Sequence, residues 1–224
     1  MTATSDIDTA RTAVAHASRT LAAAGLLIGT AGNVSVRVGE LVAVTATGAV
    51  LADIEPEQVT VLDLAGRVVT GEWAPTSEAA LHLGVLRSAP ADRVGAVVHT
   101  HAPLATTLSL VLDEVPVVHY QQLLLGGTVR VAPFHPFGSV ELAAAVGAAL
   151  DGRLAALMAN HGAVVLGADL RSAVENALLL EWVCELYWRA RAIGEPRTLD
   201  AAAQRSVVEA ATRLGYGTTK KVDA

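Results

Sequence analysis

Two short segments whose apolar residues alternate in period two place the strongest constraint on the fold of this chain. Residues 33–38 and 41–46 alternate on either side of a two-residue turn that begins with Gly39, and this pattern predicts a β-hairpin. A second strand pair is expected near 59–63 and 67–70. Because hairpins join antiparallel strands, this part of the chain predicts an antiparallel sheet rather than parallel βαβ units.

The remaining elements mix helices and short strands without a repeated βαβ unit. Helices are expected at about 8–24, 77–87, 103–112, 139–150, 169–193 and 198–213. Strands are expected at about 94–101, 115–120, 128–132, 154–159 and 163–166. This order predicts an α/β protein of the α+β type, with three α/β/α layers and a central, mainly antiparallel sheet covered by helices on both faces.

The composition fits one domain with a substantial core. Of the 224 residues, 52% are hydrophobic, which is enough for a single core. We therefore expect one domain over 1–224, with 214–224 as a flexible tail. No segment reaches the roughly 18 consecutive apolar residues of a membrane span, and residues 1–6 lack the basic and apolar regions of a signal peptide. We expect a cytoplasmic protein that does not bind membranes.

Residue types that the sequence lacks exclude several chemistries. Cys184 is the only cysteine, which excludes intrachain disulfides and cysteine-rich metal sites. The only lysines, Lys220 and Lys221, are adjacent near the end of the chain, so its body has no lysine for a Schiff base or a phosphate-binding P-loop. The net charge of −6 and the absence of a basic stripe argue against a nucleic-acid partner.

Three histidines near expected strand ends predict a metal site. His99 and His101 follow the apolar run 94–98, and alternation along a strand points both imidazoles to the same face. His161 follows another apolar stretch and precedes Gly162, which can turn the chain sharply. Catalytic zinc usually takes three protein ligands from His, Asp or Glu, so we expect zinc here. The alternative is that these are ordinary histidines at strand ends.

Three turns rich in glycine and hydroxyl groups predict a phosphate site. They cover residues 29–33, 45–48 and 75–78. Such turns and helix N-termini offer backbone N–H groups that bind anions without a basic side chain. The alternative is that they are ordinary turns and a helix cap.

Glu78 is the candidate acid–base group. A carboxylate in the first turn of a helix is favoured by the helix dipole alone, which is the structural alternative. Beside a metal ion that holds a carbonyl compound, the same carboxylate can take the proton alpha to the carbonyl. His82, one helical turn later on the same face, is expected to orient Glu78, to act as another ligand, or to be structural.

An ordered set of short motifs resembles the class II aldolases of the aldolase/adducin family, and within it the branch that acts on L-fuculose 1-phosphate. The motifs are Gly-Thr-Ala-Gly-Asn-Val-Ser at 29–35, Thr-Gly at 47–48, Ser-Glu-x3-His at 77–82, His-Thr-His at 99–101, His-Tyr at 119–120 and Asn-His-Gly at 160–162. The resemblance covers about residues 8–193. It implies the same layered fold and a homotetramer whose active sites are shared between subunits.

The resemblance also implies a role for each site residue. It assigns one zinc ion per subunit to His99, His101 and His161, and it makes Glu78 both a ligand of the empty site and the catalytic base. It makes Tyr120 of a neighbouring subunit catalytic at the oxygen of the aldehyde fragment, although by sequence alone this residue reads as a strand end. It assigns the substrate phosphate to Gly32, Asn33, Thr47, Gly48, Thr76 and Ser77.

The implied reaction is the zinc-dependent, reversible cleavage of a ketose 1-phosphate into dihydroxyacetone phosphate and an aldehyde through a metal-stabilised enediolate. Residues 134–137, Phe-His-Pro-Phe, add bulk in a region near the aldehyde, and Tyr216 matches the family's aromatic lid residue only weakly. A sugar-phosphate epimerase, dehydratase or decarboxylase of the same family is an alternative. A non-catalytic, adducin-like interaction module is another, against which the intact His and Glu set argues.

Overall fold

The computed structural model describes residues 2–217, with side chains from residue 5 onward, so the two lysines and most of the expected tail lie outside the described residues. Its strands are β1 (Asn33–Val38), β2 (Leu41–Thr45), β3 (Val59–Asp63), β4 (Val68–Thr70), β5 (Ala96–Thr100), β6 (Glu114–Val115), β7 (Val129–Ala132), β8 (Ala155–Met158) and β9 (Gly162–Gly167). They form one nine-stranded sheet in the order β4-β3-β2-β1-β5-β9-β8-β7-β6. Every neighbouring pair is antiparallel except β7 and β8. The prediction of a mainly antiparallel sheet is confirmed.

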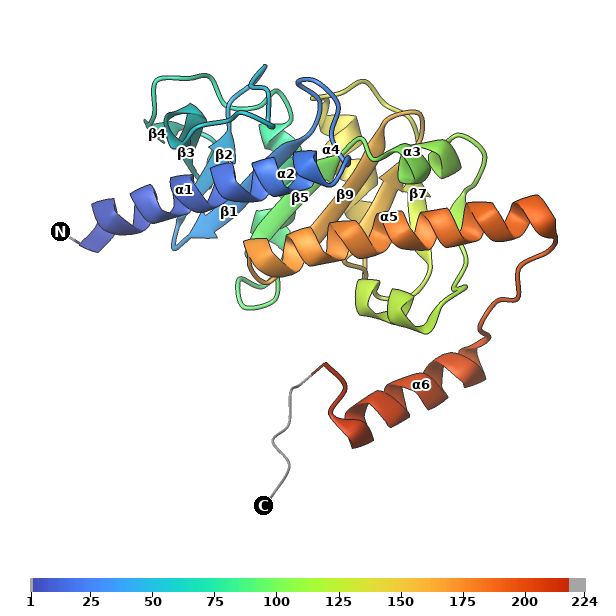
Figure 1. The fold of residues 1–224 in the computed structure, drawn as a ribbon. Helices are drawn as coiled ribbons and strands as arrows, with labels where there is room; N and C mark the ends of the chain where they lie inside the picture. The colour runs from blue at the N-terminus through green and yellow to red at the C-terminus, as the bar shows by residue number, and fades with distance from the viewer. Residues whose placement is uncertain (1, 218–224) are drawn as a thin grey trace.

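Helices cover both faces of this sheet, as Figure 1 shows. The helices are α1 (Thr2–Ala23), α2 (Ala79–Ser88), α3 (Pro103–Ser109), α4 (Val140–Ala149), α5 (Leu170–Ile193) and α6 (Ala201–Leu214), with short 3-10 helices η1 (Pro56–Gln58) and η2 (Tyr120–Leu125). Apolar side chains of α1, α3 and α5 pack in one core on one face, and those of α2 and α4 pack in a second core on the other. The three-layer prediction is therefore confirmed. Among residues 2–217 no helix has the length and apolar character to cross a bilayer.

The first hairpin forms as the sequence predicts. Ser35 pairs with Val44, and Val38 pairs with Leu41. At the turn, Gly39 has a φ of 60°, in the left-handed region that glycine enters without a steric penalty. A two-residue hairpin loop requires this conformation at its first position, which is why the glycine stands there.

The prediction of a strand at 115–120 is mostly wrong. Only Glu114–Val115 is a strand, and Tyr120–Leu125 forms η2 instead. The buried side chain of Gln122 accepts a hydrogen bond from one backbone N–H and donates to two carbonyls within residues 115–118. This amide satisfies backbone groups that a neighbouring strand would otherwise pair with, so the segment needs no partner in the sheet.

Strand order brings three distant segments together at one edge of the sheet, where the central strands β1, β5 and β9 begin or end. In the central strands, Asn33 at the start of β1 pairs with His99 near the end of β5. His99 pairs in turn with Val164, and Thr100 with Ala163, near the start of β9. Because these strands are antiparallel, the start of β1, the end of β5 and the start of β9 meet at one place.

Candidate active site

Three imidazoles converge at this edge. The ring centroids of His99, His101 and His161 lie 4.8, 4.9 and 5.0 Å apart, and one nitrogen of each ring lies within 4.8 Å of the others. His99 is fully buried, while His101 and His161 are half-buried. The predicted pair and the predicted third histidine therefore form a cluster that can hold a metal ion.

Two of these rings are in the protonation state that metals bind. Burial, with repulsion from His99, lowers the pKa of His101 to about 4. Burial also lowers the pKa of His161. Both imidazoles are neutral at pH 7, and neutral imidazole is the form that coordinates a metal.

The hydrogen bond of His99 aims its other nitrogen into the cluster. Nδ1 of His99 lies 2.9 Å from the carbonyl oxygen of Ala163. A carbonyl only accepts, so Nδ1 carries a hydrogen and Nε2 faces the cluster. That Nε2 lies 3.0 Å from Nε2 of His101 and 3.1 Å from Oε2 of Glu78. Lone pairs of Nε2 and of the carboxylate oxygen thus point into the same space, as the ligand atoms of a metal ion do.

The carboxylate of Glu78 completes this donor set. Glu78 is 5% exposed, and its Oε1 lies 3.7 Å from Nε2 of His161 but has no hydrogen-bond partner. Burial raises the pKa of Glu78, but the hydrogen bonds and charge of its neighbours outweigh burial and hold the pKa well below its usual range. Three imidazoles and an ionised carboxylate with an orphaned oxygen fit a divalent metal ion such as zinc.

The backbone at Glu78 explains why its side chain is free to join the cluster. The helix expected at about 77–87 begins slightly later, because Glu78 is the N-cap residue of α2, and Glu78 makes no side-chain capping bond. Instead, the hydroxyl of Thr76 accepts a hydrogen bond from the N–H of Glu78 at 3.3 Å. The carboxylate therefore turns away from the helix end and toward the imidazoles.

His82 supports the site without joining the metal cluster. It is fully buried, its Nδ1 lies 2.7 Å from Oγ of Ser35, and its Nε2 bonds to Oδ1 of Asn33. Asn33 in turn donates from Nδ2 to Oε2 of Glu78 at 3.0 Å. Burial lowers the pKa of His82 to about 3, so the ring is neutral, and neither nitrogen is free for a metal ion. Ser35 is not among the predicted site residues, although its spacing of two from Asn33 places both on one face of β1.

The three predicted phosphate turns meet at the same cavity, which has a volume of about 620 Å³. The six residues assigned to the phosphate all line it: Gly32, Asn33, Thr47, Gly48, Thr76 and Ser77. Glu78, His101 and His161 line it too. A β-bridge between Ala46 and Pro75 joins the second turn to the third. The structure thus places the three predicted phosphate turns beside the imidazole cluster.

Asn160 shapes the turn that presents His161. Its φ is 57°, and it is the only non-glycine residue with a positive φ between residues 2 and 217. Asparagine tolerates this conformation better than most residues. It also lines the site cavity. The sequence gives one clue to this role, an asparagine between two apolar strands and directly before His-Gly.

Gly162 is required by a close backbone approach. A Cβ at this position would lie 2.2 Å from the carbonyl oxygen of Thr100 and 3.3 Å from Cε1 of His99. We expect Gly162→Ala to lower the free energy of unfolding by about 3 kcal/mol, because the two strands must separate. Urea titration checks this value. Gly147→Ala on the exposed face of α4, where a Cβ meets nothing within 4 Å, is the control and is expected to stabilise by about 0.5–1 kcal/mol. Equal stabilities would contradict the close-approach argument.

Tyr120 does not line the site cavity of its own chain. It is 41% exposed, and its hydroxyl lies 3.3 Å from that of Tyr216. Both tyrosines line a separate, mainly apolar cavity of about 420 Å³ between η2 and α6. The structure therefore pairs Tyr120 with Tyr216 and leaves both apart from the imidazole cluster. The contribution of Tyr120 to a neighbouring subunit stays a prediction.

The segment 134–137 forms part of the wall of the site cavity. Phe134 and Phe137 are 61% and 70% exposed, an unusual state for phenylalanine. The next residue, Gly138, approaches the phosphate turn closely, since a Cβ there would lie 2.8 Å from the carbonyl oxygen of Ser77. The expectation that this segment adds bulk at the site agrees with its position.

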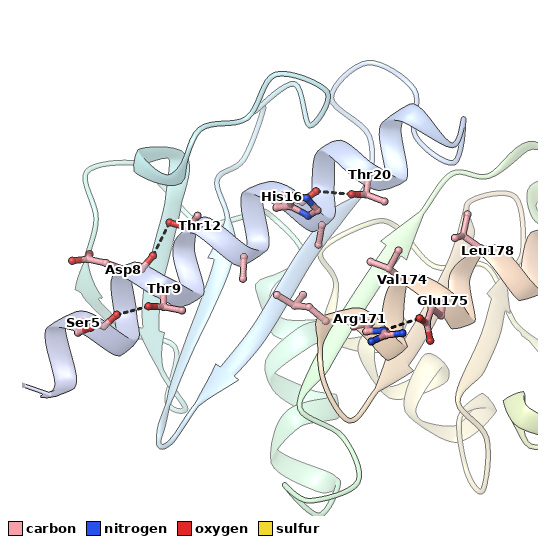
Figure 2. A pocket seen from close by; sticks show the side chains of 13 residues that line it. Ser5, Asp8, Thr9, Thr12, His16, Thr20, Arg171, Val174, Glu175 and Leu178 are labelled. Carbon is pink, nitrogen blue, oxygen red and sulfur yellow. Dashed lines mark hydrogen bonds and ion pairs between the residues drawn. The ribbon is translucent and has the colours of Figure 1, made fainter. Parts of the chain in front are cut away.

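A larger cavity, of about 1210 Å³, lies between α1 and α5 (Figure 2). Its threonine hydroxyls are bonded within their own helix, as where Thr9 donates to the carbonyl oxygen of Ser5 and Thr20 to that of His16. Its charged pair, Arg171 and Glu175, is likewise one turn apart on α5. These polar groups do not converge on a common point, so size alone does not make this cavity a candidate site.

Comparison with known proteins agrees with this geometry. A 5-methylthioribulose-1-phosphate/5-deoxyribulose-1-phosphate aldolase of Rhodospirillum rubrum is 38% identical over 198 residues, covering 86% of each chain. An L-fuculose phosphate aldolase of Escherichia coli is 34% identical over 173 residues, covering 77% of this chain and 79% of that protein. The solved structure of an L-fuculose 1-phosphate aldolase superposes with a TM-score of 0.86 at 30% identity, covering 91% of this chain and 96% of that one.

A family model gives the same result. Residues 12–188 match the model described as Class II Aldolase and Adducin N-terminal domain. This range contains the imidazole cluster, Glu78 and the three phosphate turns. The chain therefore belongs to the class II aldolase and adducin family.

Proposed function

We propose that this protein is a zinc-dependent aldolase that reversibly cleaves a ketose 1-phosphate into dihydroxyacetone phosphate and an aldehyde. One observation carries the proposal: two imidazoles of the cluster, the carboxylate of Glu78 and the three predicted phosphate turns line one cavity of about 620 Å³. A phosphate site beside a metal site is the arrangement that a phosphorylated ketone requires. Relatives of this chain are named as aldolases of such sugar phosphates.

His99, His101 and His161 would hold one zinc ion per subunit. When bound, the ion supplies the positive charge that polarises the substrate carbonyl and stabilises negative charge on the adjacent oxygens. Glu78 lies close enough to join the ligands while no substrate is present.

The phosphate turns orient the substrate. Residues of the turns at 29–33 and 45–48 line this cavity together with Thr76 and Ser77, and this part of the lining would receive the phosphate. Amide and hydroxyl donors bind an anion without a lysine, consistent with a body of the chain that has none. The phosphate thus fixes the position of the carbon that reacts.

Glu78 and Tyr120 move the protons. In the direction of synthesis, Glu78 takes a proton from the carbon next to the ketone of dihydroxyacetone phosphate, and the electron pair stays on that substrate fragment. The carbon then bonds to the aldehyde carbon, and Tyr120 of a neighbouring subunit gives its phenolic proton to the aldehyde oxygen. Glu78 then gives its proton to solvent and Tyr120 takes one from solvent. Cleavage follows the reverse path.

The cavity wall favours an aldehyde with an apolar end. Phe134 and Phe137 expose apolar rings, which give no hydrogen-bond partner to an additional hydroxyl group on the aldehyde fragment, such as the one that L-fuculose 1-phosphate carries. A 5-deoxy or 5-methylthio ketose 1-phosphate, the substrate type in the name of the Rhodospirillum rubrum relative, suits this wall better than L-fuculose 1-phosphate, the substrate that the sequence motifs imply.

A substrate panel tests the function. Zinc-loaded protein is incubated with 5-methylthioribulose 1-phosphate, 5-deoxyribulose 1-phosphate and L-fuculose 1-phosphate, and dihydroxyacetone phosphate is measured. We expect release from all three and the highest kcat/KM for the first two. If no substrate releases dihydroxyacetone phosphate, the proposed aldolase activity is overturned. Formation of an epimer instead would favour the epimerase alternative.

We further propose that the active unit is a cytoplasmic homotetramer with shared sites. Leu124 on η2 is 53% exposed beside Tyr120, which suits a subunit interface. Mixing the inactive variants Glu78→Gln and Tyr120→Phe after dissociation is expected to restore activity, because some sites then receive both native groups. Native mass spectrometry verifies the mixing. Mixed oligomers that stay as inactive as their parents would refute the shared site.

A further inference from the structure

Four buried polar side chains form one hydrogen-bonded row that ends at Glu78. Ser35 and Asn33 project from the same face of β1, and His82 of α2 bonds to both. Asn33 then donates to Glu78. Ser35 and His82 are 0% exposed, and Asn33 and Glu78 are 5% exposed. A core position usually holds an apolar side chain, so this row of polar groups calls for a reason beyond packing.

The chemistry of the groups fixes the direction of every bond in the row. Nδ2 of Asn33 faces the ionised carboxylate, which only accepts, so Oδ1 of Asn33 faces His82 and accepts too. His82 therefore carries its proton on Nε2, and its bare Nδ1 accepts from the hydroxyl of Ser35 at 2.7 Å. Each donor meets one acceptor, so the row has a single consistent arrangement.

This arrangement makes the two oxygens of Glu78 different. Oε2 is tied to Asn33 at 3.0 Å, whereas Oε1 is buried and has no hydrogen-bond partner. Turning the carboxylate about its last bond would break the bond from Asn33. Oε1 is the oxygen whose lone pairs are free to receive a proton.

We propose that His82 and Ser35 are positioning residues, which hold Asn33 so that Glu78 presents Oε1 to the substrate. This inference rests on the proposed function, in which Glu78 takes the proton from dihydroxyacetone phosphate. The proton goes to Oε1, and the electron pair of the C–H bond stays on the substrate carbon. His82 and Ser35 are fully buried and act only through Asn33.

Two substitutions of His82 separate this role from packing. In His82→Gln the side-chain amide keeps an N–H near the place of Nε2 and can still donate to Asn33, whereas the leucine of His82→Leu fills similar space without donating. We expect His82→Leu to lower kcat by about 10- to 100-fold, with KM within about 3-fold of the native value and zinc content unchanged. His82→Gln is expected to recover most of kcat.

Proton exchange isolates the step on which the row acts. With dihydroxyacetone phosphate alone in D₂O, the native protein is expected to exchange the C–H proton for deuterium, and His82→Leu to do so more slowly by the same factor as kcat. Exchange in His82→Leu at the native rate would overturn the positioning role. A native protein that neither exchanges nor cleaves would overturn the proposed function instead.

A serine pair supplies the matched control and covers failure of His82→Leu to fold. Ser35→Ala is expected to slow exchange in the same direction, by a smaller factor. Ser18→Ala removes another 0% exposed hydroxyl, which donates only to the carbonyl of Val14 within α1, and is expected to leave exchange unchanged. Native exchange in Ser35→Ala, or equal slowing in both variants, would overturn the proposal.

Discussion

Glu78→Gln is expected to lower the turnover of ketose 1-phosphate cleavage by on the order of 10²-fold or more, while the protein keeps its fold. The amide is close in shape to the carboxylate but cannot accept the substrate proton. Its effect on phosphate binding is expected to be small, because the phosphate turns use other groups. Steady-state kinetics measures turnover, and calorimetry measures the affinity for dihydroxyacetone phosphate.

Glu175→Gln is the matched control for this variant. Glu175 undergoes the same chemical change on the exposed surface of α5, where its partner is Arg171 at 2.9 Å. We expect native turnover, because exposed ion pairs contribute little to stability and this one lies outside the site cavity. Native turnover in Glu78→Gln would make the base assignment untenable.

Removal of one imidazole is expected to remove the metal ion. The native protein should bind about one zinc per chain, and His99→Ala should reduce this to a small fraction, because two imidazoles and a carboxylate hold zinc much more weakly than three imidazoles with the carboxylate. His161→Ala should behave in the same way. Elemental analysis after gel filtration gives the zinc content, and chelation of the native protein should abolish cleavage until zinc is returned.

His16→Ala is the control for the metal prediction. His16 lies on the exposed face of α1, and the imidazole cluster does not include it. The His16→Ala variant is therefore expected to bind as much zinc as the native protein. Unchanged zinc in His99→Ala and His161→Ala as well would overturn the assignment of the metal site.

Local patterns in the sequence were enough to predict most of the layers. Alternation over 33–38 and 41–46 predicts the hairpin because each strand has a buried face, and Gly39 marks the turn by its conformational freedom. The prediction of a strand at 115–120 was mostly wrong, because backbone groups of this segment bond to the side chain of Gln122. No local pattern reveals a side chain that folds back on its own segment.

The candidate site, too, depends partly on local sequence and partly on tertiary structure. The sequence by itself determined which residues can do the chemistry, since His99 and His101 are two apart on a strand and Glu78 stands at a helix start. Only the tertiary structure decided how they meet. His161 comes within reach because β9 pairs with β5.

The role of His82 also depends on the tertiary structure. Its spacing on α2 allows His82 to orient Glu78, to be another ligand or to be structural. The contact of α2 with β1 occupies both ring nitrogens with Asn33 and Ser35, which argues against the ligand role. The physical reason is that a hydrogen bond extends about 3 Å, whereas His82 is 49 residues from Asn33 along the chain. Sequence fixes each group's chemistry, and the packing of the sheet against α2 fixes its partner.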